Sequence, residues 1–155
     1  MSDAYKKCKG VWDTFAACVG FLINDVVKEF GDKGWEVASN ACRKAGFLLA
    51  RDFIESNKIK ELGTESFGKL YLNIGGVSDF GVEVPVLTEK KCVLKAHFCP
   101  YIDVWKKGNI SRKDICDILC KADEGAAQAF NPKLKLTLTK TLTQGDSYCE
   151  YVFEE

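Results

Sequence analysis

The sequence predicts an α+β fold, in which N-terminal helices pack on an antiparallel sheet and a further helix precedes a C-terminal β-hairpin. Three observations carry this prediction. Apolar residues recur every three or four positions over residues 3–57, which is the period of an amphipathic helix. The period becomes two over residues 70–98, and a helical pattern then precedes two more alternating segments. Helices and hairpins segregated along the chain are typical of the α+β class.

Two helices are predicted in the N-terminal part. Residues 3–30 form the first, which ends at Gly31-Asp32-Lys33-Gly34, where glycine stops one helix and Asp32 can cap the next. Residues 34–57 form the second. The predicted apolar positions are Trp12, Phe15, Ala16, Val19, Leu22, Ile23, Val26 and Phe30 in the first helix, and Ala38, Ala41, Cys42, Ala45, Leu48, Leu49 and Phe53 in the second. Small residues among the latter should let another element approach closely.

Three strands are predicted next, at residues 70–74, 82–86 and 92–98. Gly75-Gly76 breaks the first of them. Pro85 places the second at a sheet edge or strand end, because proline cannot donate a hydrogen bond to a neighbouring strand. Alternation of apolar and polar residues along a strand is typical of an antiparallel sheet that has one face in the core and the other in water.

A helix and a hairpin complete the predicted fold. Pro100 opens a short helical turn, and a longer helix runs from a Ser111 cap to about Phe130, where Asn131-Pro132 stops it. The hairpin strands, residues 134–139 and 148–153, turn at Gln144-Gly145-Asp146. We expect one domain over residues 1–155, with a helical part at 1–60 and a sheet-and-helix part at 67–155.

Composition argues against several classes of partner. The 22 basic and 22 acidic residues cancel, so a nucleic-acid binder, which needs clustered Lys and Arg, is not expected. The longest apolar run, Phe15–Ile23, has nine residues and is short of the ~20 that span a bilayer. Flanking acidic residues do not suit a signal peptide. We therefore expect a cytoplasmic protein whose eight cysteines are reduced.

The common catalytic and nucleotide-binding motifs are missing from the sequence, including GxxxxGK[ST], GxGxxG, HExxH and GxSxG. The one histidine, His97, lies two residues before Cys99 near the end of a predicted strand. Their side chains are therefore expected on one face, as two metal ligands or as a thiol and its base. The alternative is a partly exposed histidine beside a buried thiol.

The remaining cysteines fall into two groups. Cys8, Cys18 and Cys42 lie on the predicted N-terminal helices, Cys42 on the apolar face, and Cys92 lies on a predicted strand; all four are interpreted as core packing. Cys116, Cys120 and Asp123 lie at i, i+4 and i+7 of one helix and border its apolar stripe. A buried carboxylate needs a partner, which could be a cation, a ligand or backbone donors; the alternative is a half-exposed Asp123.

Four thiols could converge between helix and sheet: Cys99, Cys116, Cys120 and Cys149. Such a set could bind a zinc ion or an iron–sulfur cluster. Spacing alone supports this weakly, because the paired CxxC motifs of zinc ribbons and ferredoxins are missing from the sequence.

The C-terminal half resembles the L-2-amino-thiazoline-4-carboxylic acid hydrolase family, which itself looks related to 4-vinyl-reductase-type small-molecule-binding domains. The resemblance rests on Cys99-Pro100, on the run Cys120-Lys121-Ala122-Asp123, and on the segment from Thr141 to Cys149 followed by Tyr151. It covers roughly residues 35–153 and is dense over 92–153. It implies an α+β fold and hydrolysis of a carbon–nitrogen bond in a cyclic amidine, with Cys99, Cys120, Asp123 and Cys149 on shared positions.

Three functions therefore compete. The first is a cyclic-amidine hydrolase in which Cys99 attacks, Asp123 holds the amidinium and His97 moves the proton. The second is a non-catalytic domain that binds a small molecule, a metal or an iron–sulfur cluster. The third is an interaction module that forms a homodimer through the wide apolar stripe of the N-terminal helix over residues 11–30.

Overall fold

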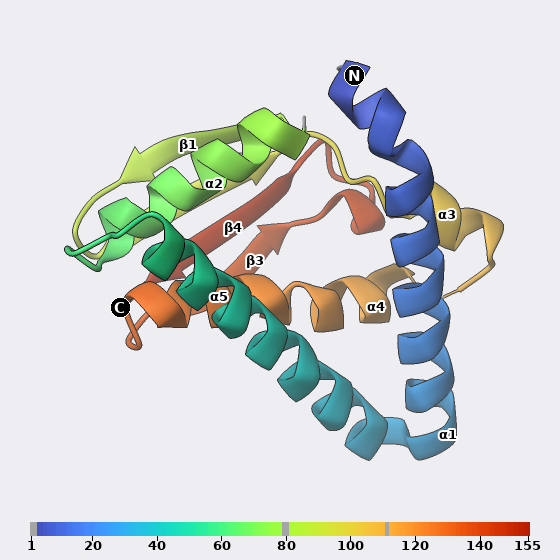
Figure 1. Ribbon diagram of the computed structural model, residues 1–155. Helices are drawn as coiled ribbons and strands as arrows, with labels where there is room; N and C mark the ends of the chain where they lie inside the picture. Colours follow the sequence, from blue (N-terminus) through green and yellow to red (C-terminus); the bar gives the residue numbers. More distant parts are fainter. Residues whose placement is uncertain (1–2, 79–80, 111) are drawn as a thin grey trace.

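The computed structural model describes residues 3–78, 81–110 and 112–155, and it confirms the α+β class (Figure 1). The helices are α1 (Asp3–Ser56), α2 (Thr64–Ser78), α3 (Ile102–Lys107), α4 (Arg112–Leu119) and α5 (Lys121–Phe130), with a short 3-10 helix, η1 (Leu142–Gln144). The strands are β1 (Val82–Leu87), β2 (Lys91–Ala96), β3 (Lys135–Lys140) and β4 (Cys149–Glu154).

The four strands form one antiparallel sheet in the order β1-β2-β4-β3. Strand β1 lies at an edge, as Pro85 predicts, and its pairing with β2 shifts register between Glu83 and Val86. The predicted C-terminal hairpin is confirmed as β3 and β4. Between them η1 ends at Gly145, whose φ of 98° is a left-handed conformation that suits glycine.

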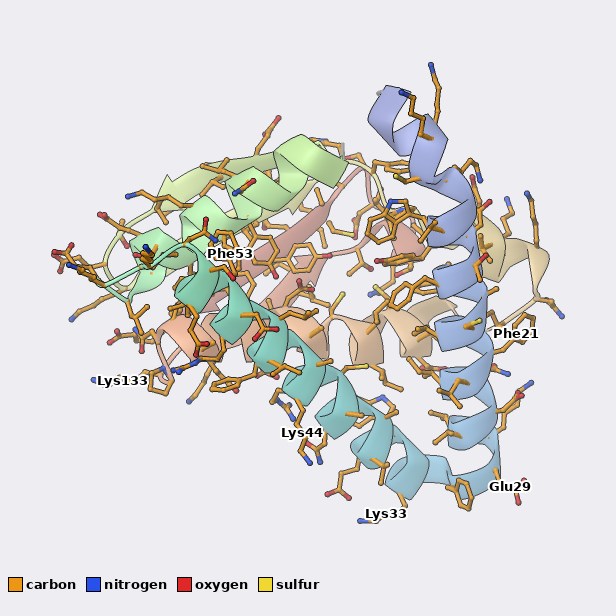
Figure 2. All side chains as sticks on the ribbon, viewed as in Figure 1. Phe21, Glu29, Lys33, Lys44, Phe53 and Lys133 are labelled. Carbon is orange, nitrogen blue, oxygen red and sulfur yellow. The ribbon has the colours of Figure 1, made fainter. Side chains whose placement is uncertain are left out.

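The two predicted N-terminal helices are two arms of α1, joined at a kink. Gly31 there has φ 55° and ψ −134°, a conformation that is costly for any residue with a Cβ. We call residues 3–30 the first arm and residues 32–56 the second arm. They form a V in Figure 1, and Glu29 and Lys33 lie at its tip in Figure 2.

The second arm packs against α5 through glycines on both helices. A Cβ added at Gly46 would lie 1.8 Å from the carbonyl oxygen of Ala122, and one at Gly125 would lie 1.9 Å from that of Arg43. The prediction of a close approach is therefore right. Of the predicted residues, Ala38 and Cys42 are half-buried and pack against a core cluster, whereas Ala41 and Ala45 are exposed. The buried positions of this arm are Gly34, Ser39, Gly46, Ala50 and Ile54. The face of the second arm that packs on α5 therefore contains Gly46, whereas the larger apolar residues Leu48 and Leu49 are exposed.

The predicted first strand, residues 70–74, is wrong, because this segment lies within α2. Phe67, Leu70 and Tyr71 fall at i, i+3 and i+4, so they share one helix face; Phe67 and Leu70 are buried and Tyr71 packs beside them. Leu72 is exposed, although alternation placed it with Leu70. The Gly75-Gly76 pair is helical rather than a strand break. Figure 1 shows α2 lying across the sheet, beside β1.

Two hydrophobic clusters hold the elements together. The first joins the sheet to α2, α5 and the end of α1, and includes Phe67, Leu94, Phe130 and Phe153. The second joins the first arm of α1 to α3 and α4. Within it, the Trp105 indole donates to the carbonyl of Ala16 at 2.8 Å.

The predicted helix over 111–130 is present as α4 and α5, divided at Cys120, whose ψ of −6° departs from helical geometry. Its predicted end at Phe130 is confirmed. The predicted cap, Ser111, lies outside the described residues. The one residue between the two helices is therefore a cysteine, Cys120, which is also one of the candidate site residues.

Much of the predicted apolar stripe on the first arm faces outward. Val11, Leu22 and Phe30 are 72%, 66% and 63% exposed, whereas Ala16 and Ile23 are buried. Leu48 and Leu49 of the second arm are exposed as well. By length and composition alone, the described helix Lys6–Ser56 contains a window that is apolar enough to cross a membrane, and 22% of that window is buried. Signal sequences and the mostly buried core helices of soluble proteins pass the same test. Dimerisation through the exposed face stays a prediction.

Candidate functional site

A group of buried and half-buried thiols, tyrosines and one carboxyl lies where α4 meets α5, opposite β4 and α2. We call it the thiol–tyrosine cluster, with members Cys99, Cys116, Cys120, Cys149, Asp123, Tyr71, Tyr101 and Tyr151. Its residues come from α2, the loop before α3, the α4–α5 junction and β4. Side chains fill the space between the arms of α1, α5 and the sheet in Figure 2.

The centre of the cluster is a pair of thiols on either side of the helix division. The Sγ atoms of Cys116 and Cys120 lie 3.9 Å apart, and both residues are buried. A hydrogen bond from Cys120 lowers the pKa of the Cys116 thiol, and Thr143 also lowers it by hydrogen bonding to the same sulfur. The pKa of Cys120 is raised well above its usual value, first by this hydrogen bond and then by burial.

Cys120 also contacts Tyr151 and Asp123. The Tyr151 hydroxyl lies 3.8 Å from the Cys120 sulfur and acts to lower the pKa of that thiol. The Cys120 proton can point to Asp123 instead of Cys116, and a hydrogen bond to the Asp123 carboxyl lowers the pKa of that carboxyl. Asp123 can therefore accept the proton of the Cys120 thiol, and the Tyr151 hydroxyl can donate a hydrogen bond to its sulfur.

The half-buried Asp123 side chain accepts a hydrogen bond from the Tyr71 hydroxyl. Burial raises the pKa of Asp123 to about 6, against the opposing effect of the bonds from Tyr71 and Cys120. The partners that a buried carboxyl requires are thus side chains of α2 and of its own helix region. A carboxyl with a pKa near 6 can accept a proton close to neutral pH.

Cys99 and Cys149 lie at the edge of the cluster and are held by backbone groups. The Cys99 sulfur accepts from the amides of Tyr101 and Ile102, and burial raises its pKa to about 12. The Cys149 sulfur accepts from the amide of Leu142 at 3.3 Å, and burial raises its pKa. Both sulfurs interact electrostatically with Cys116. The four cysteines predicted to converge therefore occupy one region.

His97 lies apart from this region. Strand β2 ends at Ala96, so the prediction that His97 and Cys99 leave the same face of a strand is wrong. The His97 side chain is exposed; its Nε2 lies 3.3 Å from a Glu83 oxygen, and its ring packs against Tyr148. Its predicted role as a proton carrier remains a prediction without a contact to the thiols.

The other cysteines divide differently from the packing prediction. Cys92 is fully buried and Cys42 is half-buried, as expected, but Cys8 and Cys18 are exposed. Among the residues that the structure describes, no group of three or more His, Cys, Asp or Glu side chains is arranged to hold a metal ion. The described donor set therefore does not fit a zinc ion or an iron–sulfur cluster.

A cavity of about 230 Å³ opens beside the cluster, and Cys120 forms part of its wall. Trp35 comes from the second arm of α1, Leu136 and Leu138 from β3, and Asp117 and Lys121 flank the thiol on either side of the helix division. Sequence reasoning missed this cavity. A larger hollow of about 530 Å³ lies between the end of α1 and α2, away from the thiols and lined largely by polar side chains.

Lys121 is held in place at the mouth of this cavity. Its Nζ lies 3.2 Å from Glu124, which also forms an ion pair with Arg43 of α1 at 2.9 Å. The cavity thus offers an apolar wall, an amine, a carboxylate and a thiol. Small-molecule sites typically combine an apolar lining with a few convergent polar groups of this kind.

No curated protein matches the chain in sequence. Among solved structures, the chain is similar to a trafficking protein particle complex subunit 3 from Naegleria fowleri, described as covalently bound to palmitic acid. The TM-score is 0.68, with 16% sequence identity over 94% of this chain and 95% of that chain. At this identity the likeness concerns the fold alone.

The family profile described as L-2-amino-thiazoline-4-carboxylic acid hydrolase matches residues 13–153. The match runs from the first arm of α1 to β4, so it extends well beyond the C-terminal segment that carries the motif resemblance. It includes each member of the thiol–tyrosine cluster and each residue that lines the cavity at Cys120. The chain therefore belongs to the L-2-amino-thiazoline-4-carboxylic acid hydrolase family.

Proposed function

We propose that this protein hydrolyses a cyclic amidine of the 2-aminothiazoline-4-carboxylate type in the cavity at Cys120. The family name suggests a hydrolase of this type. The observation that carries the proposal is the set of groups around one cavity, where a thiol, an amine and a carboxylate are combined with apolar walls. A cavity of about 230 Å³ suits a small substrate rather than a drug-sized one.

Each part of such a substrate has a complementary group in the cavity. The Lys121 ammonium can pair with the substrate carboxylate, and the Asp117 carboxylate can accept hydrogen bonds from the amidinium. Leu136 and Leu138 provide an apolar surface for the ring. Two charged anchors of opposite sign fix the orientation of the amidine carbon relative to the thiol.

Cys120 is the nucleophile in this proposal. Sequence reasoning favours Cys99, but Cys120 lies on the cavity wall and has Asp123 as a proton acceptor. Tyr71 orients that acceptor, which completes the arrangement of nucleophile, base and orienting group. The Tyr151 hydroxyl supplies a donor to the sulfur as it becomes negative.

The reaction then proceeds in two steps. The Cys120 sulfur adds to the amidine carbon while its proton passes to Asp123; the bond from that carbon to the ring nitrogen breaks, and the nitrogen takes up the proton and leaves as an amine. Water next adds to the same carbon and the Cys120 thiolate departs. The sum is one substrate and one water converted into an S-carbamoyl thiol that carries a free amine.

A second candidate is a non-catalytic small-molecule-binding protein. The likeness to a trafficking subunit described as covalently bound to palmitic acid favours it, because it shows this fold in a protein with a bound organic group. A binding protein would retain its ligand unchanged. Conversion of the ligand separates the two candidates.

The test is an assay of ring opening on 2-aminothiazoline-4-carboxylate, followed by appearance of the new amine. We expect turnover by the native protein and a loss of about 10³-fold or more in Cys120→Ala, because a covalent nucleophile has no substitute. The exposed-thiol variant Cys18→Ser is the matched control and should retain activity. No turnover by the native protein, or full turnover by Cys120→Ala, would contradict the proposal.

A further inference from the structure

We propose that Cys116 and Cys120 form a redox-active dithiol, which closes to a disulfide when a hydroperoxide reaches Cys120 through the cavity. Both residues are free cysteines in the structure. Their sulfur atoms already lie 3.9 Å apart. The disulfide would join the last turn of α4 to the start of α5.

The backbone geometry suits this bond. Residues four apart in a helix have Cα atoms about 6 Å from each other, within the range that disulfides use. The Cys120 amide still donates to the Cys116 carbonyl at 2.9 Å, so the two residues keep this helical relation. The sulfurs must approach to about 2.05 Å. Because Cys120 lies at the division between two helices, its backbone can adjust without distorting a continuous helix.

The other thiols of the cluster are less free to pair. Two backbone amides donate to the Cys99 sulfur, and the Leu142 amide donates to the Cys149 sulfur. By contrast, Cys116 and Cys120 have side-chain partners, and each is a partner of the other. The structure therefore selects one pair among the buried thiols.

Access to the pair is on the Cys120 side. Cys120 lines the cavity, whereas Cys116 is not among the lining residues and hydrogen-bonds with Thr143. The expected order is attack by the Cys120 sulfur on a peroxide oxygen, which breaks the O–O bond and leaves a sulfenic acid and an alcohol or water. The Cys116 sulfur then attacks the Cys120 sulfur; the S–O bond breaks, and the Cys116 proton leaves with the departing oxygen as water.

The step balances for a hydroperoxide as oxidant. Two thiols lose two electrons and two protons in total, one S–S bond forms, and the hydroperoxide is reduced to an alcohol and water. A dithiol reductant reverses the change. If the proposed function holds, the oxidised protein also lacks its nucleophile, so peroxide would reversibly stop hydrolysis; disulfide formation itself does not depend on that function.

The test uses the full chain, reduced, then exposed to hydrogen peroxide, alkylated and digested with trypsin. Cleavage after Lys113 and Lys121 places both cysteines on the peptide Asp114–Lys121. We expect this peptide to become two hydrogens lighter and to lose both alkylation sites, and a dithiol reductant to restore them. Cys116→Ser and Cys120→Ser should abolish the change, and Cys149→Ser should leave it intact.

Three results would overturn the proposal. The first is full alkylation of both cysteines after peroxide. The second is cross-linking of either one to the Cys99 or Cys149 peptide. The third is oxygenation of the pair that a reductant does not reverse. The same peroxide treatment in urea measures how readily the two cysteines pair in the unfolded chain, where they are close only in sequence. A disulfide yield in urea equal to that of the folded protein would also contradict the proposal. The readout is a peptide mass, so it is independent of whether any substrate is hydrolysed.

Discussion

The buried carboxyl of Asp123 makes a quantitative prediction about stability. Its pKa is raised from 3.8 to about 6 by burial in the folded protein. The folded state therefore binds this proton more tightly than the unfolded state. The resulting stability is present below about pH 4 and is lost as the pH rises through about 6. The difference in pKa corresponds to about 3 kcal/mol at pH 7, where the carboxylate is buried in its charged form.

Asp123→Asn removes the ionisation and should therefore change the pH profile. Relative to the native protein, we expect the free energy of unfolding of the variant to increase by about 3 kcal/mol between pH 4 and pH 7. A weaker hydrogen bond to Tyr71 would lower the free energy of unfolding of the variant equally at pH 4 and at pH 7. The expected increase between the two pH values would therefore remain. The assay is urea unfolding followed by tryptophan fluorescence at a series of pH values.

The control for this experiment is Asp52→Asn, an exposed aspartate on the second arm of α1. Water solvates the Asp52 carboxyl in the folded and the unfolded protein, so the stability profile of this variant should run parallel to that of the native protein. If the profile of Asp123→Asn is also parallel to the native one, the carboxyl is not buried in the way described, and the reasoning is refuted.

Other predictions follow from the same geometry. Tyr71→Phe removes a hydrogen bond that lowers the pKa of Asp123, so the acidic limb of the activity profile should move to higher pH; an unmoved limb would exclude Asp123 as the base. Gly125→Ala should lower the free energy of unfolding by about 3 kcal/mol or more, because its Cβ meets backbone, while Gly10→Ala, in open space on a helix, should raise it slightly; equal effects would argue against the close contact. If the exposed face of the first arm pairs two copies, light scattering should give a dimer that Leu22→Glu converts to a monomer, and a native monomer would end that prediction.

Local sequence patterns predicted most of the fold, because the conformational preferences of a few neighbouring residues determine where helices and strands begin and end. Pro85 at an edge strand, Gly31 at the kink and Asn131-Pro132 at a helix end each follow from the backbone preferences of one or two residues. The segment at 70–74 failed because Leu70 and Leu72 alternate over a stretch too short to separate period two from period 3.6. Phe67, which shares a helix face with Leu70 and Tyr71 and so indicates a helix, lies before the alternating residues.

Non-local packing explains what the sequence could not predict. The convergence of Cys116, Cys120 and Asp123 follows from helical spacing, and it was therefore predictable. The cavity at Cys120 requires Trp35 and two leucines of β3 to meet the same helix, which no spacing rule contains. Packing between distant elements also selects the buried face of the second arm of α1, where Gly46 meets Ala122 and Gly125 meets Arg43.

The central claim is that Cys120 attacks the substrate. The most direct test is to mix the protein with 2-aminothiazoline-4-carboxylate, quench with acid within a single turnover, and measure the mass of the peptide Asp114–Lys121. We expect the mass of this peptide to increase by that of one substrate molecule, with the adduct located on Cys120 and missing in Cys120→Ser. Product formation with this peptide unmodified, or an adduct on Cys99, would contradict it.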